Sequence, residues 1–299
     1  MTIKASLRVI LRGGGRRSPG YRLPSWPARP DGIVDTSQMA DDDVAVEHLV
    51  SPPINEVVCG FIFDPLKGLD PVLVGAYWST RTEEFPEKHI GPPIADATAP
   101  FFGDMLMVRT LLIDKAQVFL LQIQTDRFYL NWRRRNDEYP RFSDHPGQSI
   151  GILSKALAEF ERFQIFCESH LGKRPLPSRL ELAKVDCLVE SKHWRNLEDL
   201  STLLPFVKPL SGLAQGADPQ LALHFAEDRP TGRLSVSFAL AKRSGENGTQ
   251  RVLNLESRMS AAMTTNPKDD FARLNVELNH VFASLIPREE RDARFGGQK

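Results

Sequence analysis

A group of arginines and tyrosines between residues 127 and 141 is the part of the chain best equipped for chemistry. Arginine side chains bind phosphates and carboxylates through two parallel hydrogen bonds, and aromatic rings stack on nucleotide bases. The group follows a predicted turn at Asp126, so it could present an anion- or nucleic-acid-binding face. Its members are Arg127, Tyr129, Arg133, Arg134, Arg135, Tyr139 and Arg141.

The same region also has a purely structural interpretation. Asp126 can cap the tight turn that it occupies, while Asn131 and Arg133 can make hydrogen bonds between neighbouring elements. Glu56 is a second unusual acid, because it lies within the apolar run 54–58. A buried carboxylate needs a partner, so we interpret Glu56 and Asp126 as structural ion-pair candidates rather than catalytic acids.

The sequence contains no recognisable catalytic or metal-binding motif. The glycines at 13–15 are followed by arginines instead of the Lys-Ser/Thr pair of a phosphate-binding loop. The seven histidines are isolated. Cys59, Cys167 and Cys187 lie far apart in apolar stretches, which is typical of small buried hydrophobes in a reducing compartment. We therefore predict no catalytic residue, no metal and no cofactor.

Composition limits the class of protein. The 299 residues balance 38 Lys and Arg against 38 Asp and Glu, so no global field draws the protein to nucleic acid or membrane. The apolar runs are far shorter than the roughly 20 residues of a membrane helix, and we expect a cytoplasmic protein. Residues 1–30 carry basic residues but no acid. We predict a disordered, basic, Gly/Pro-rich segment over residues 1–50, with a phosphate-contacting arm as the alternative.

Hydrophobic periodicity predicts an α+β protein from residue 51 onward. The first series ends in a long helix at about 147–170, with Gly172 as its C-terminal cap. The elements expected before it are a strand at 54–63, a helix at 72–85, a loop at 91–100, and strands at 108–113, 118–124 and 128–134.

The same series then restarts. The second set comprises a strand at 180–189, a helix at 194–204, strands at 221–225, 234–240 and 251–259, and a closing helix at about 269–285. This order predicts a tandem duplication, with a first lobe over 51–174 and a second over 175–299. Each lobe would be an antiparallel sheet covered on one face by its long helix.

Four segments are distinctive when taken together: 53–61, 78–86, 122–133 and 139–142. The most specific is Gln-Ile-Gln-Thr-Asp-Arg-Phe followed by Asn-Trp-Arg, within residues 122–133. The chain, over roughly residues 50–297, resembles an uncharacterised, sporadically distributed family of bacterial and archaeal proteins. The resemblance implies a prokaryotic protein without an established activity, so no catalytic residue is carried over. Such a patchy distribution is typical of accessory genes, including those for defence.

Three functions are open at this point. The first is a non-enzymatic binding protein that recognises a protein partner through its sheets or the groove between its lobes. The second is nucleic-acid binding through the arginine group, with the two sheets forming a saddle. The third is small-molecule binding or an enzymatic role, in a pocket between a sheet and its long helix.

Overall fold

The computed structural model describes residues 49–94, 108–136, 139–144, 150–207, 222–245, 248–264 and 266–296, so the predicted disordered segment falls almost wholly outside it. The strands are β1 (Ile54–Phe63), β2 (Glu87–Gly91), β3 (Arg109–Ile113), β4 (Phe119–Gln124), β5 (Arg127–Arg133), β6 (Pro177–Val189), β7 (Ala222–Arg229), β8 (Gly232–Gly245) and β9 (Gly248–Ala262). The helices are α2 (Pro71–Ser79), α3 (Ile152–Leu171), α4 (Leu197–Leu203), α6 (Pro267–Leu285) and α7 (Arg288–Phe295), with a 3-10 turn η1 (Pro205–Val207).

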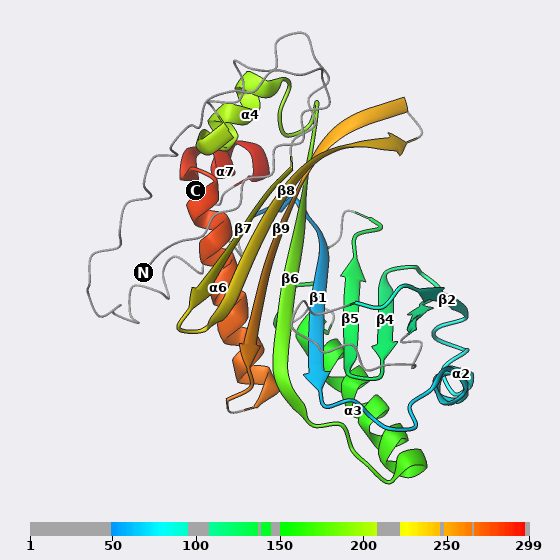
Figure 1. Cartoon of the computed structure of the whole chain (residues 1–299). Helices are drawn as coiled ribbons and strands as arrows, with labels where there is room; N and C mark the ends of the chain where they lie inside the picture. Colours follow the sequence, from blue (N-terminus) through cyan, green and yellow to red (C-terminus); the bar gives the residue numbers. More distant parts are fainter. Residues whose placement is uncertain are drawn as a thin grey trace, which may run out of the picture.

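The strands of the described residues form one antiparallel sheet, in the order β2-β3-β4-β5-β1-β6-β9-β8-β7 (Figure 1). Its two central strands join the halves of the chain, because β1 pairs with β6 along its whole length. The prediction of a separate sheet for each lobe is therefore wrong. Both strands are largely buried. If they did not pair with each other, each would leave buried main-chain groups without hydrogen-bond partners, and this cost favours one continuous sheet.

The long helices α3 and α6 cover the same face of this sheet. α3 packs on β1 and β5, and α6 packs on β6 and β9. Phe61 of β1 contacts both helices. Its ring stacks on Phe160 of α3, with 4.1 Å between centroids, and meets Phe271 of α6 edge to face at 5.3 Å. One hydrophobic core consequently runs beneath both halves of the chain.

Polar caps and one glycine explain the helix boundaries. Asp70 begins α2 by accepting a hydrogen bond from the main-chain amide three residues later, and Asn266 begins α6 in the same way. Proline occupies the first turn of both helices, where its missing amide hydrogen costs nothing. Gly172 ends α3 in the left-handed conformation with φ 64°, which confirms its predicted role.

Three elements differ from the sequence prediction. α2 ends at Ser79 instead of residue 85, because the chain then turns and Arg81 donates to the buried carboxylate of Glu159 at 2.7 Å. β2 was not predicted, since its side chains are mostly exposed and show no hydrophobic alternation. α7 was not predicted either. It buries only Phe295, so its sequence carries no apolar stripe.

The face of the sheet turned away from α3 and α6 is called the open face below. It carries a small apolar cluster of Val58, Tyr129 and Ala183, on which Ile94 packs. Buried polar residues of the neighbouring strands, among them Gln122, Asn131 and Glu181, lie on the same face. None of the described helices has both the length and the apolar character needed to cross a membrane.

Candidate functional site

Asp126 and Arg127 form an ion pair at the edge of the open face. The Nη2 and Nε atoms of Arg127 lie 2.7 and 3.0 Å from the two carboxylate oxygens of Asp126. The arginine side chain is only 2% exposed. Because this guanidinium already binds a carboxylate within the fold, it is poorly placed to bind an anion from solvent.

A chain of side-chain hydrogen bonds crosses the open face from β3 to β1. Arg109 donates to Gln122 at 3.0 Å, Gln122 donates to Asn131 at 2.6 Å, and Asn131 donates to Glu56 at 2.6 Å. Glu56 thus accepts from an amide, while Arg133 lies opposite it in the β1–β5 register. The distinctive Gln and Asn residues of segment 122–133 therefore tie neighbouring strands together.

The arginines at the end of β5 bind main-chain carbonyl groups. Arg133 Nη2 and Arg135 Nε both donate to the carbonyl oxygen of Gln117, at 3.1 and 2.9 Å. Arg134 Nη1 donates to the carbonyl oxygen of Pro52 at 2.7 Å. Burial lowers the pKa of Arg133, and the positive charge of Arg135 adds to this effect. These contacts occupy donors that a phosphate would need.

Tyr129 is buried at the centre of the open face. Its ring lies over Gly60 of β1, where an added Cβ would come within 2.3 Å of the ring. Burial raises the pKa of the Tyr129 hydroxyl to about 12. The side chain is 1% exposed, so the ring has no free face on which a base could stack.

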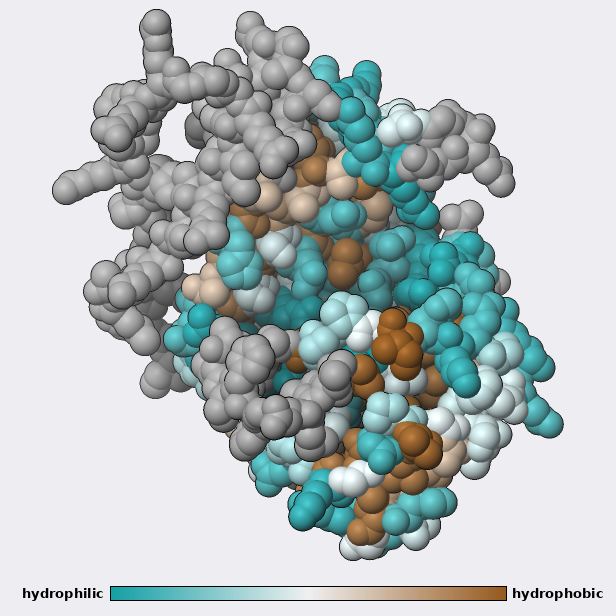
Figure 2. Space-filling view, turned by 45° about the vertical axis from the view of Figure 1, so that its right-hand side comes forward, coloured by the Kyte–Doolittle hydropathy of each residue, from teal (hydrophilic) through white to brown (hydrophobic). Residues whose placement is uncertain are grey.

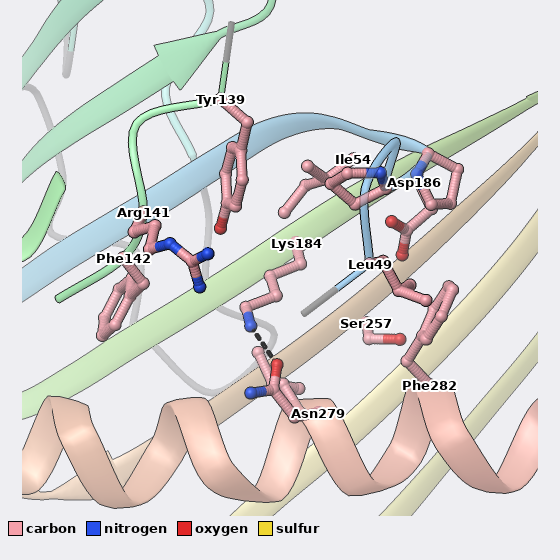
Figure 3. A pocket seen from close by; sticks show the side chains of 13 residues that line it. Leu49, Ile54, Tyr139, Arg141, Phe142, Lys184, Asp186, Ser257, Asn279 and Phe282 are labelled. Atoms are coloured by element: carbon pink, nitrogen blue, oxygen red, sulfur yellow. Dashed lines mark hydrogen bonds between the residues drawn. The ribbon is translucent and has the colours of Figure 1, made fainter. Parts of the chain in front are cut away.

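Tyr139 and Arg141 lie elsewhere, at a cavity on the helix-covered side of the sheet (Figure 3). This seam cavity has a volume of about 50 Å³. Its walls are β6, β9 and α6, and it is bordered by residues 49–54 and by the 139–142 loop. Both halves of the chain therefore contribute to it, and the structure separates Tyr139 and Arg141 from the other members of the predicted arginine group.

The sheet turns polar side chains toward the seam cavity. Lys184 and Asp186 of β6 both line it, and Ser257 of β9 lies directly opposite Lys184 in the strand register. Asp186 is 6% exposed and Ser257 is 3% exposed. They lie on the same side of the sheet as the core residues of these strands, so a polar cluster interrupts an otherwise apolar layer.

The cavity also receives polar groups from α6 and from the loop after β5. Lys184 Nζ donates to Asn279 Oδ1 of α6 at 2.5 Å. Figure 3 shows the guanidinium of Arg141 and the ammonium of Lys184 extending toward the same space, with Asp186 and Ser257 on its other side. Two basic side chains and one carboxyl group thus line the described part of the cavity.

Two further groups of the cavity differ in their surroundings. The Ser257 hydroxyl is buried without a hydrogen-bond partner among the described residues, whereas the Asp186 carboxyl interacts electrostatically with Lys184. Burial raises the pKa of Asp186 to about 7, and the positive charge of Lys184 opposes this rise. At neutral pH the carboxyl is therefore present in both protonation states, and it can either donate or accept a hydrogen bond.

Sequence reasoning missed Lys184, Asp186, Ser257 and Asn279. A signal was present for the first two. Side chains alternate along β6, so Lys184 and Asp186 lie on the same face of the strand as the core residues Leu182 and Leu188. Charged residues at inward positions of a central strand are unusual and often mark a site. Nothing in the sequence alone shows that Asn279 of α6 lies against Lys184.

The cysteines and His193, which could act as nucleophiles, bases or metal ligands, are buried in the described structure. The described residues contain no cluster of His, Cys, Asp and Glu able to hold a metal ion. The three cysteines are free and buried, which confirms that part of the sequence interpretation, and burial raises the pKa of the Cys59 thiol. Burial also lowers the pKa of His193 to about 4, so its neutral ring accepts a hydrogen bond from the Val189 amide at 2.9 Å.

Comparison with known proteins gives no independent assignment. No protein-family model matches the sequence, and no match is found among curated proteins.

Proposed function

We propose that the protein is a binding protein that takes a small polar ligand into the seam cavity. The observation that supports this most strongly is the placement of Lys184, Asp186 and Ser257 around one cavity on the core side of the sheet. This is the third of the functions left open by the sequence, a ligand held between a sheet and a long helix.

The energetic cost of this arrangement supports a functional role. A buried polar group without a hydrogen-bond partner costs about 1–3 kcal/mol, and a buried charge costs more. Apolar side chains at these strand positions would stabilise the core, as their neighbours do. Proteins retain such costly groups chiefly where a ligand or a reaction requires them.

Binding without catalysis is supported by the surroundings of Ser257. A serine nucleophile needs a base within hydrogen-bond reach, and the Ser257 hydroxyl has no such partner among the described residues. Lys184, the basic group opposite it on β6, is hydrogen-bonded to Asn279. We therefore propose that the protein binds its ligand without transforming it.

Thermal unfolding in the presence of a panel of small acids, amines, amides and sugars tests this function. A cognate ligand raises the melting temperature of the wild type in proportion to the logarithm of its concentration. Asp186→Asn should lose or alter this response. Asp228→Asn, whose side chain is 73% exposed on β7, is the matched control and should keep it. A panel in which no compound acts differently on wild type and Asp186→Asn would oppose the proposal.

Recognition of a protein partner is a second candidate, and β7 is the element that favours it. Among the described elements, β7 is paired only with β8, and its Phe225 is 40% exposed. An exposed strand edge can accept a strand from another chain. A partner recovered by the wild type and by Asp186→Asn, but not by Phe225→Asp, would support this use of the edge.

No large apolar docking surface accompanies that edge on the face seen in Figure 2. Hydrophobic residues there form separate patches among hydrophilic ones, within the coloured part of the surface. The exposed large hydrophobic residues of the described chain lie on different elements: Val50, Val72, Ile90, Ile150, Ile165, Leu176 and Phe225. Protein recognition therefore has weaker support than the cavity.

The order of the strands also supports the predicted duplication. β5 pairs with β1 as β9 pairs with β6, and a long helix follows each outer group of strands. We infer that the two lobes are duplicated units whose first strands meet at the centre of the sheet. Membership of the sporadic prokaryotic family, and a cytoplasmic location, stand as proposals beside it.

A further inference from the structure

We infer that two copies of this chain associate through β7, with the two β7 strands paired antiparallel about Ala226. This inference goes beyond the proposed ligand-binding function, and it depends on none of the groups of the seam cavity. It follows from the way in which the two ends of the sheet are built and from the order of side chains along β7.

The β2 end of the sheet has features that oppose pairing with another strand. β2 and β7 lie at opposite ends of the sheet, and among the described strands each pairs with a single neighbour (Figure 1). β2 is five residues long, carries the exposed Lys88, and is followed by Pro92 and Pro93. Short length, lysine and proline are features by which edge strands avoid joining another chain. β2 is therefore a poor template for a further strand.

β7 has none of these features. It is eight residues long, pairs with β8 at every position without a bulge, and contains neither lysine nor proline. Phe225 lies at the rim of the core, where it meets Phe238 edge to face, and 40% of it is exposed. A regular edge strand of this kind can accept another strand. An added strand would cover the Phe225 ring and pair the outer main-chain groups of β7.

Alternation divides the side chains of β7 between the two faces of the sheet. Leu223 belongs to the core, and Arg229 forms an ion pair with Glu277 of α6, so the odd-numbered side chains lie on the helix-covered face. The open face carries the even-numbered side chains of His224, Ala226 and Asp228. A twofold axis perpendicular to the sheet keeps each face on its own side. Odd-numbered residues of one copy then lie opposite odd-numbered residues of the other, and even-numbered opposite even-numbered.

The order of side chains favours one register among these. With the axis at Ala226, His224 of each copy lies opposite Asp228 of the other, so the pair occurs twice. An imidazole ring can donate a hydrogen bond to a carboxylate, and such cross-strand pairs stabilise a sheet. An axis at Glu227 would place two acids opposite each other. An axis at Phe225 would leave His224 opposite Ala226, without its acidic partner.

The contacts within each copy are compatible with this pairing. Asp228 Oδ1 accepts a hydrogen bond from Arg233 at 2.9 Å, and both side chains are largely exposed. The second carboxylate oxygen can accept from the His224 ring of the other copy, because a carboxylate has several acceptor positions. His224 is exposed on the open face. The pairing therefore requires no contact of the described fold to break.

Sedimentation velocity of the purified full-length protein over a wide range of concentrations tests self-association. We expect a reversible monomer–dimer equilibrium with a dissociation constant in the micromolar range, because one strand pair makes a small interface. Ala226→Lys places two lysines opposite each other at the axis and should weaken the dimer about fivefold. Ala76→Lys is the matched control, because Ala76 is exposed on α2, and it should leave the equilibrium unchanged. A protein that stays monomeric at every concentration would overturn the inference.

An exchange of charges tests the register. His224→Asp brings a carboxylate opposite Asp228 at two places and should weaken the dimer about tenfold. The double substitution His224→Asp/Asp228→His restores an unlike pair at both places and should return the dissociation constant close to that of wild type. Far-UV circular dichroism and the melting temperature establish that each variant is folded. If Ala226→Lys does not fold, this exchange of exposed side chains carries the comparison alone. A double substitution as weak as the single one would overturn pairing about Ala226.

Two further outcomes locate the contact and separate it from the proposed function. Ile90→Lys changes the exposed side chain of β2 and should leave the dimer unchanged, whereas its loss would move the contact to the β2 end and overturn the inference. Capture of a different protein through the Phe225 edge, by a chain that stays monomeric, would also overturn it and support the second candidate function. The response of Asp186→Asn to small ligands is measured independently, so either result can fail without the other.

Discussion

Lys184 and Ser257 face each other across the β6–β9 pair, on the side of the sheet that α6 covers. Side chains of a strand alternate between its two faces, so a residue at either position must point toward the core. Lys184 finds a partner in Asn279, whereas the Ser257 hydroxyl has none among the described residues. The pair therefore combines a half-buried lysine that is hydrogen-bonded within the fold with a buried hydroxyl that has no partner among the described residues.

Replacing Ser257 by alanine should leave the fold intact and weaken only ligand binding. The buried hydroxyl lacks a partner in the described structure, so its removal costs no hydrogen bond and relieves desolvation. We expect the free energy of unfolding to stay the same or rise by about 1 kcal/mol. Urea denaturation measures this, with Ser235→Ala on the open face as control. A loss of stability greater than about 1 kcal/mol would show that the hydroxyl has a structural partner.

The ionisation of Asp186 should lower the free energy of unfolding as the pH rises from about 4 to about 7. Its folded pKa of about 7 is far above the ordinary value of 3.8, so the folded state keeps a proton that the unfolded state has released. The native state therefore binds more protons in this window, and stability falls with increasing pH. Below about 4 both states are protonated and the slope from this group vanishes.

Asp186→Asn removes that slope. We expect the difference in unfolding free energy between variant and wild type to grow across this window by an amount on the order of a few kcal/mol, and then to level off. Urea denaturation at half-unit pH steps measures it. Asp228→Asn serves as control for an exposed acid. Parallel curves for Asp186→Asn and wild type would mean that the carboxyl ionises normally in the folded protein.

Glu159 holds α3 to the turn after α2, and its neutralisation should be costly. The carboxylate is fully buried and accepts from Arg81 at 2.7 and 3.1 Å and from Arg162 at 2.7 Å. Glu159→Gln removes the buried counter-charge of these arginines and leaves the half-exposed Glu84 as their acidic partner, so we expect a loss of about 3 kcal/mol in unfolding free energy. The exposed Glu161→Gln is the control and should change stability by less than about 0.5 kcal/mol.

Local patterns were sufficient to predict much of the fold. The long helices follow from apolar residues at offsets of three and four, and β8 follows from strict alternation of Leu234, Val236, Phe238 and Leu240 with smaller residues. These signals depend only on neighbours in sequence. The exposed strand β2 produces no such signal, so the sequence predicts no element over residues 87–90.

Contacts between residues that lie far apart in the chain could not be predicted from the sequence. The joining of two sheets into one depends on β1 and β6 pairing across a separation of more than a hundred residues. The seam cavity depends on α6, β6 and the 139–142 loop meeting in space. Conversely, the arginine group was assembled from sequence proximity alone. Strand β5 places Arg127 on the open face, whereas Arg141 belongs to the 139–142 loop at the seam cavity on the opposite side.

The arginines at the end of β5 should matter for stability and not for nucleic-acid binding. Arg133 and Arg134 donate to the carbonyl oxygens of Gln117 and Pro52. The Arg133→Ala/Arg134→Ala variant should lose about 2 kcal/mol of unfolding free energy, about 1 for each hydrogen bond. Its retention on immobilised DNA and RNA should equal that of wild type at every salt concentration. Steeply salt-dependent retention that the double substitution abolishes would restore the nucleic-acid hypothesis.

Gly60 and Tyr129 should show strong energetic coupling. The Tyr129 ring occupies the space above Gly60, and a Cβ added there would come within 2.3 Å of it. Gly60→Ala forces the ring out of a packed layer, so we expect a loss of about 2 kcal/mol. In a Tyr129→Ala background the ring is gone and Gly60→Ala should cost less than about 0.5 kcal/mol. A coupling energy of at least about 1 kcal/mol, measured by urea denaturation of all four proteins, is the expected result. Additive losses would mean that Tyr129 can move aside without cost, and that the glycine is required by the backbone instead of the ring.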